Sequence, residues 1–183
     1  DLSVNLGRLR SVQVFVVGQA KRPGNYTVSS LSTLVNALFA SGGPAGKGSM
    51  RRIQLKRGNQ VVTEFDIYDL LIKGDKSRDV PLKQGDVIYI PPVGPMVAVG
   101  GSVNVPGILE LKNQGSLGEV IDYAGGLDTT ASGKKTTIER IEDRRVRKVD
   151  EFTLDQAGLS RALKDGDLVN ILALSARIEN AVT

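Results

Sequence analysis

The charged side chains are the groups in this sequence that could do chemistry. The 183 residues include neither histidine nor cysteine, so the commonest general base, metal ligand and thiol nucleophile are missing. Carboxylates occur in close pairs, such as Asp66 with Asp69 and Asp165 with Asp167. Glycoside hydrolysis needs two carboxylates facing each other across a cleft, whereas these positions are typical of a helix cap and of turns. We therefore expect no enzymatic activity, no metal and no cofactor.

Basic residues are concentrated around one predicted strand, Ile53–Leu55. Guanidinium groups pair bidentately with carboxylates, so this cluster could contact an acidic polysaccharide. The alternative, which the pattern favours, is an edge strand that charge protects from aggregation. The cluster comprises Lys47, Arg51, Arg52, Lys56 and Arg57.

A second candidate for a sugar contact is Tyr26, which stands beside Lys21, Arg22 and Asn25 at a predicted hairpin. Loops on rigid scaffolds often carry function, and a tyrosine ring can stack on a sugar. The alternative is that the ring packs on the core and leaves its hydroxyl in solvent. Nucleic acid is a poor fit, because no pair of aromatic residues alternates with the basic ones on a strand.

These residues are positioned by elements that the chain contains twice. The segment 14–43 is repeated without a gap by 97–126, so that equivalent residues lie 83 positions apart. A period this long indicates two copies of a small domain, because solenoid units run roughly 20–50 residues. We expect a flank at 1–11, domains at 12–93 and 94–174, and the start of a following segment at 175–183. Because the chain begins with Asp1, we interpret it as a piece of a longer protein.

Each copy predicts the order strand, strand, helix, strand, strand, short helix, strand. Val12, Val14 and Val16 alternate as in a half-buried strand. Leu34 and Leu38 lie on one face of a helix, with Ser32 or Thr33 as the N-cap and Gly42 or Gly43 closing it. The pattern predicts an α+β fold in which a mixed sheet wraps over one main helix, a β-grasp. The competing ferredoxin-like topology has a single strand before its first helix.

The two copies differ in charge. Residues 12–93 carry 11 Lys and Arg against 6 Asp and Glu, whereas residues 96–174 carry 10 against 12. No segment reaches the ~20 apolar residues of a membrane span, and we expect no membrane insertion.

The repeated motif resembles a known family. The motif is similar to that of the soluble-ligand-binding β-grasp (SLBB) domain. It consists of the pattern V-x-V-x-G-x-V/A-x-x-P-G, then a helix ending in A/S-G-G, and finally a closing strand G-D-x-I/V-x-I. In the first copy, the match is carried by Val14, Val16, Gly18, Pro23, Gly24, Gly42, Gly43, Gly85 and Asp86. In the second, it is carried by Val97, Val99, Gly101, Pro106, Gly107, Gly125, Gly126, Gly166 and Asp167.

Two such domains in tandem resemble bacterial polysaccharide export proteins. The resemblance implies a non-enzymatic periplasmic scaffold in capsule or exopolysaccharide secretion, within an outer-membrane-associated parent protein. It implies three partners: an acidic polysaccharide, a homo-oligomeric ring of the parent, and an inner-membrane export partner. One alternative is a purely structural protein–protein assembly module. Another, a cobalamin-type small-molecule binder, is disfavoured because no histidine can serve as a metal ligand.

Overall fold

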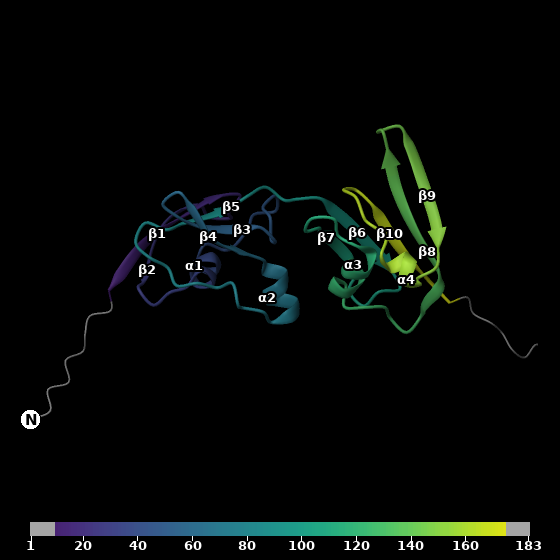
Figure 1. Ribbon diagram of the computed structural model, residues 1–183, viewed down its shortest axis with the longest axis horizontal. Coiled ribbons are helices and arrows are strands. Elements are labelled where there is room, and N and C mark those ends of the chain that lie inside the picture. Colours follow the sequence, from purple (N-terminus) through teal and green to yellow (C-terminus); the bar gives the residue numbers. More distant parts are fainter. Residues whose placement is uncertain (1–9, 175–183) are drawn as a thin grey trace, which may run out of the picture. The chain divides into compact units, whose positions relative to one another are not determined.

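The computed structural model describes residues 10–174, and the chain divides into two units between Val93 and Gly94. We call them domain 1 and domain 2. Within the described residues, domain 1 contains five strands and two short helices (Figure 1). These are β1 (Ser11–Gly18), β2 (Gly24–Ser29), α1 (Leu34–Ala40), β3 (Ile53–Arg57), β4 (Gln60–Phe65), α2 (Ile67–Lys73) and β5 (Val87–Ile90).

Domain 2 repeats this order of elements, which confirms the predicted succession in both copies. Its elements are β6 (Met96–Gly101), β7 (Gly107–Glu110), α3 (Leu117–Tyr123), β8 (Ala131–Glu142), β9 (Val146–Phe152), α4 (Gln156–Leu159) and β10 (Leu168–Ala173). The segment 175–183, expected to begin a further unit, lies outside the described residues, as does nearly all of the flank 1–11.

Each domain is built on a mixed five-stranded sheet. The strand order is β2-β1-β5-β3-β4 in domain 1 and β7-β6-β10-β8-β9 in domain 2. The first and last strands run parallel, with Val16 opposite Ile88 and Val99 opposite Val169, and the other pairs are antiparallel. This is the predicted β-grasp. The ferredoxin-like alternative is wrong, because two strands precede the helix.

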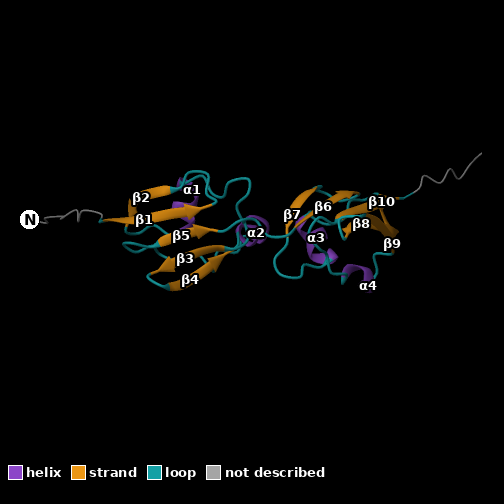
Figure 2. Ribbon diagram, turned by 90° about the horizontal axis from the view of Figure 1, so that it is seen from above, coloured by secondary structure: helices purple, strands orange, loops and turns teal. Residues whose placement is uncertain are grey.

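The core of domain 1 lies between one face of the sheet and α1 (Figure 2). Alternation along β1 turns Val14 and Val16 inward, where both are fully buried. Leu34 and Leu38, one helical turn apart, meet them from α1. Thr33, one of the two residues predicted as the N-cap, caps this helix. Because α1 covers a single face, the alternate residues of every strand lie on the opposite face of the sheet.

Gly18 and Gly101 end the first strand of each domain at a position that excludes a side chain. A Cβ on Gly18 would lie 2.2 Å from the Ile90 carbonyl oxygen, and one on Gly101 would lie 2.1 Å from that of Ile171. Both glycines also have positive φ, +85° and +77°, a conformation that other residues adopt at a cost. The repeated glycine is therefore a requirement of the parallel β1–β5 and β6–β10 contacts.

The hairpin of β8 and β9 is the main difference between the two domains. Its strands have 12 and 7 residues, whereas the equivalent strands β3 and β4 of domain 1 have 5 and 6. The turn between them places two non-glycine residues at positive φ, Asp143 at 51° and Arg144 at 55°. Figure 1 shows this hairpin projecting from the rest of domain 2. No helix within residues 10–174 is long and apolar enough to cross a membrane.

Candidate functional site

Two of the four candidates at the first hairpin have structural partners. The Arg22 guanidinium donates to the carbonyl oxygens of Ala40 at 2.8 Å and Ser41 at 3.5 Å, at the C-terminus of α1. A cation there stabilises the negative end of the helix dipole. The Tyr26 ring packs against the core, which was the predicted alternative to a sugar contact. Its hydroxyl, expected in solvent, donates to the Arg22 carbonyl oxygen at 2.6 Å.

Lys21 and Asn25 are exposed but lie on different sides of the sheet. The Lys21 side chain lies beside Gly42, just after α1. Asn25 pairs with Phe15 in the β1–β2 ladder, which puts it on the face opposite α1. The four residues around the first hairpin therefore do not converge on one binding site.

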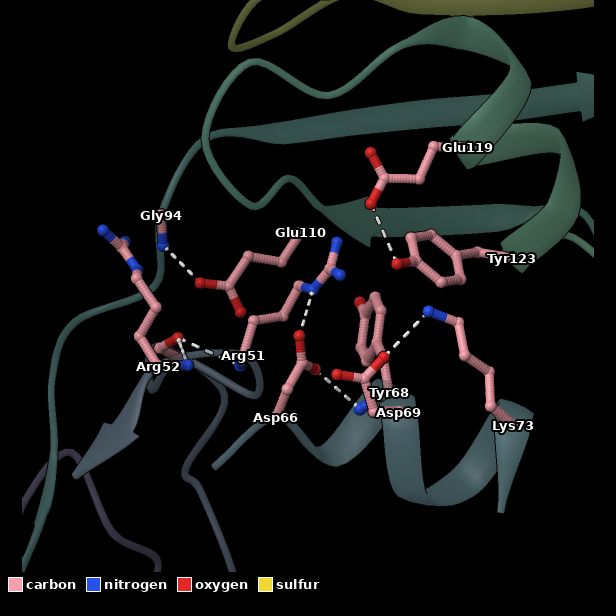
Figure 3. A network of polar contacts seen from close by, with 11 residues as sticks. Arg51, Arg52, Asp66, Tyr68, Asp69, Lys73, Gly94, Glu110, Glu119 and Tyr123 are labelled. Atoms are coloured by element: carbon pink, nitrogen blue, oxygen red, sulfur yellow. Dashed lines mark hydrogen bonds and ion pairs between the residues drawn. The ribbon is translucent and has the colours of Figure 1, made fainter. Parts of the chain in front are cut away.

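Arg51, the first arginine of the basic cluster, is internal to domain 1. Its side chain is 3% exposed, and its Nε lies 3.1 Å from Oδ2 of Asp66 (Figure 3). The guanidinium also lies 4.9 Å from the centre of the Tyr68 ring. Asp66 caps α2 by accepting the Tyr68 amide at 2.9 Å, as predicted. Arg51 thus fixes the start of α2, and the neighbouring Arg52 donates its backbone amide to Ser49 Oγ at 3.0 Å.

Arg57, at the end of the same strand, forms a bidentate pair with Asp86. Its Nε and Nη2 reach the two carboxylate oxygens at 2.8 Å each, and Nη2 also reaches the Pro81 carbonyl at 3.3 Å. The Lys83 amide donates to the same carboxylate at 2.8 Å. The Asp86 side chain is fully buried, so each of these donors compensates for the lost hydration.

Domain 2 contains the same pair. Arg140 reaches both oxygens of Asp167, at 2.7 Å and 2.5 Å, and also the Ala162 carbonyl at 3.4 Å. The Lys164 amide completes the arrangement at 2.8 Å. The Asp of the G-D motif is therefore a buried anchor that links the last strand to the middle hairpin.

The pairing shifts the ionisation of these groups. Burial raises the pKa of Asp86, but the hydrogen bonds from Arg57 and from the Lys83 amide more than offset this, so its pKa lies below the ordinary value. The pKa of Arg57 is raised, mainly by its hydrogen bond to Asp86. The pKa of Arg140 is likewise raised by its hydrogen bond to Asp167. The shifts of Asp86 and Arg57 both favour the charged forms, so domain 1 holds this pair ionised at neutral pH.

The edge-strand interpretation of the basic cluster is wrong. β3 lies between β5 and β4, and it pairs with both of them. The edge strand on this side of the domain 1 sheet is β4, which contains one charged residue, Glu64. Arg51, just before β3, and Arg57, at its end, are bonded within domain 1. Lys56 is the residue of the cluster whose side chain β3 turns toward the face opposite α1.

Lys56 belongs to a surface that the sequence analysis did not identify. We define the open face of domain 1 as Phe15, Val17, Gln54, Lys56 and Tyr89. Strand pairing brings them together, because Val17 and Gln54 both lie opposite Tyr89, and Phe15 and Lys56 both lie opposite Val87. Phe15 is 40% exposed and Val17 is 38% exposed. Their alternation with Val14 and Val16 was the signal that could have revealed this face.

The open face combines an aromatic surface with a positive charge. The Lys56 ammonium lies 4.7 Å from the centre of the Tyr89 ring, a distance at which the ring face attracts a cation. Gln54 adds a hydrogen-bonding amide, and the Phe15 ring stands one strand away. Apolar rings, an amide and a cation are suited to a weak contact with an acidic sugar polymer.

Domain 2 lacks these groups at the equivalent positions. Ala98 replaces Phe15, Asn170 replaces Tyr89 and Glu139 replaces Lys56. The smaller side chains leave a hollow of about 280 Å³, lined in part by Ala98, Gly100 and Asn170. Glu139 also lines it and lies 2.6 Å from Arg147. This face carries a carboxylate where domain 1 carries an ammonium, so the candidate surface is not duplicated.

The acidic residues noted in the sequence have partners close by in the structure. No group of three or more potential metal ligands occurs among residues 10–174. The two aspartate pairs noted in the sequence have local roles: Asp69 pairs with Lys73 at 2.9 Å, and Asp165 accepts the Met96 amide at 2.7 Å. Their partners, Asp66 and Asp167, cap α2 and bind Arg140.

Comparisons with known proteins agree on one kind of domain. Residues 12–90 match one SLBB domain model, and residues 96–150 match a second. Two Escherichia coli proteins, each called polysialic acid transport protein KpsD, are 32% identical to this chain over 104 residues. The matched segment is 56% of this chain and 18% of either relative. The chain thus corresponds to a small part of those proteins.

Proposed function

Because both domains of this chain belong to the SLBB family, we propose that it is a non-enzymatic module of a polysaccharide export protein. Its similarity to polysialic acid transport proteins supports a role in capsule or exopolysaccharide secretion. In this proposal the module is periplasmic, and its parent is an outer-membrane-associated protein that assembles into rings and meets an inner-membrane export partner.

We further propose that the open face of domain 1 contacts the polysaccharide. The observation that carries this step is the grouping of Phe15, Tyr89 and Lys56 on one uncovered sheet surface. Sialic acid polymers carry a carboxylate on each sugar, so Lys56 supplies the complementary charge and the rings supply apolar contact. Of the residues singled out in the sequence, Lys56 and Asn25 share this side of the sheet.

Such a contact is weak for one module and becomes effective through repetition. An exposed ion pair contributes about 0–1 kcal/mol, which one lysine cannot turn into tight binding. A polymer that touches several copies in a ring binds each further copy as an intramolecular event. Weak individual contacts also let the polymer move, as export requires.

The test is equilibrium binding of sialic acid oligomers to this chain at low and at moderate ionic strength, measured by microscale thermophoresis. We expect weak binding that falls as salt screens the Lys56 contact, and weaker binding of neutral oligosaccharides of equal length. If acidic and neutral sugars gave the same result at both salt concentrations, polysaccharide contact by this module would be rejected. The alternative function, protein–protein assembly, would then take precedence.

A further inference from the structure

The outer strand of the long hairpin, β9, is built to pair with a copy of itself. β9 is the last strand in the sheet order of domain 2, and no strand among residues 10–174 pairs with its outer side. It is also exposed, with Val146 58% and Val149 56% accessible. An unpaired strand edge presents a row of backbone donors and acceptors to any strand that can match it.

The residues of β9 are self-complementary when read in opposite directions. Its sequence, VRKVDEF, has two basic residues before Val149 and two acidic residues after it. Antiparallel alignment of two copies about Val149 sets opposite charges against each other and apolar residues against apolar ones. The resulting pairs are Val146 with Phe152, Arg147 with Glu151, Lys148 with Asp150, and Val149 with Val149.

We propose that this chain forms a two-fold dimer in which β9 pairs with β9 of a second copy. The two sheets would then continue into each other across the contact. Charged cross-strand pairs of opposite sign stabilise a sheet, and like charges directly opposite destabilise it. Each pair occurs twice in a two-fold contact, so four favourable charge pairs surround the central valines.

The charges of β9 are available for this contact. Lys148 and Asp150 lie 3.9 Å apart within the strand, and their side chains are 54% and 47% exposed. Glu151 lies 3.6 Å from Lys135 and is 56% exposed. These two ion pairs are long and exposed, so they cost little to rearrange. Arg147 is 72% exposed but lies 2.6 Å from Glu139 on β8, so pairing with Glu151 of a second copy competes with that exposed contact. An opposing strand offers each side chain a partner directly across the ladder.

The edge strand of domain 1 lacks this property. β4 reads QVVTEF, and antiparallel alignment with itself would set Val61 against Glu64 with no opposite charge. Its Thr63 hydroxyl is also bonded to the Arg78 carbonyl at 3.2 Å. Charges that protect an edge are effective when they repel a second copy, whereas those of β9 attract one.

This dimer is independent of the polysaccharide contact proposed above. A two-fold contact uses the same patch on both copies and closes at two, so it cannot by itself build a ring. It would join two copies of the parent protein through their second domains, whatever the first domains bind.

The experiment measures the mass of the chain by sedimentation equilibrium over a range of concentrations. The wild-type chain is expected to associate weakly, as small interfaces do, and to approach twice its monomer mass at about 1 mM. Arg147→Glu and Glu151→Arg each set like charges against each other and should weaken association by about tenfold or more. Arg144→Glu, in the turn, is the control and should leave association unchanged.

Mixing the two single variants gives the decisive result. In a mixed dimer every altered position faces an opposite charge again, so the equimolar mixture should recover dimers that neither variant forms alone. The double variant Arg147→Glu/Glu151→Arg should recover them as well. A wild-type chain that stays monomeric at about 1 mM, or variants that fail to recover dimers on mixing while their amide NMR spectra remain folded, would overturn the proposal.

Discussion

The guanidinium of Arg57 donates two hydrogen bonds of 2.8 Å to the carboxylate of Asp86, and Arg140 holds Asp167 in the same way. The two arginines are 83 residues apart and the two aspartates 81. The pair thus survives a change in loop length between the copies. Because each aspartate side chain is fully buried, the arginines are part of the framework of each domain.

Arg57→Ala is expected to lower the free energy of unfolding of domain 1 by about 3 kcal/mol, because it leaves a buried carboxylate without its countercharge. Arg140→Ala should do the same to domain 2. Lys83→Ala is the control, since its backbone amide, which binds Asp86, is retained; it should change stability by about 0.5 kcal/mol or less. Urea unfolding of each variant measures these differences, and an equal effect of all three would contradict the structural role.

Acid should destabilise domain 1 through Asp86. Its pKa in the folded state lies below the ordinary value, so its contribution is complete above an unfolded-state pKa of about 3.9 and is lost as pH falls through the folded value. The free energy of unfolding, measured from about pH 5 down to about pH 2, should therefore fall less steeply in Asp86→Asn than in the wild type. Identical slopes would show that Asp86 does not couple folding to protonation.

Gly18→Ala should be more damaging than Gly58→Ala, although both glycines have positive φ. At Gly18 the added Cβ would meet the Ile90 carbonyl oxygen at 2.2 Å, whereas at Gly58 it would meet nothing within 4 Å. The Gly58 variant should lose about 1 kcal/mol through backbone strain alone, and the Gly18 variant clearly more. Thermal unfolding monitored by circular dichroism compares them; equal midpoints would contradict the packing at the end of β1.

The element order was predictable because apolar periods and turn residues are local signals. The role of Arg57 was not, because its partner lies 29 residues away and only the strand order brings them together. The repeat did hold a signal: Arg57 and Asp86 are retained as Arg140 and Asp167, whereas Lys56 becomes Glu139. A residue kept while its neighbours change is a candidate for the framework.

The open face was missed for a different reason. Phe15 and Tyr89 belong to strands distant in sequence, and the parallel β1–β5 pairing that joins them cannot be read from local patterns. The edge-strand interpretation failed in the same way, because strand order places β4, and not β3, at the edge. Sequence patterns assign residues to faces, whereas neighbours on a face depend on topology.

Lys56→Glu should weaken binding of sialic acid oligomers several-fold, because it gives domain 1 the charge that Glu139 gives domain 2. Lys21→Glu makes the same change in net charge beside α1, away from the open face, and is the matched control. Its effect should be small once salt screens long-range attraction. Thermophoresis at moderate salt compares the two, and equal losses would point to net charge instead of a defined surface.

The most direct test of the polysaccharide contact is a map of amide NMR shifts during titration with sialic acid oligomers. We predict shifts concentrated on β1, β3 and β5 around Phe15, Lys56 and Tyr89, diminished by salt and clearly smaller in Lys56→Glu at the same sugar concentration. Neutral oligomers should produce weaker shifts. Shifts that fall elsewhere, or none at millimolar sugar, would contradict the assignment of the open face of domain 1 as the contact surface.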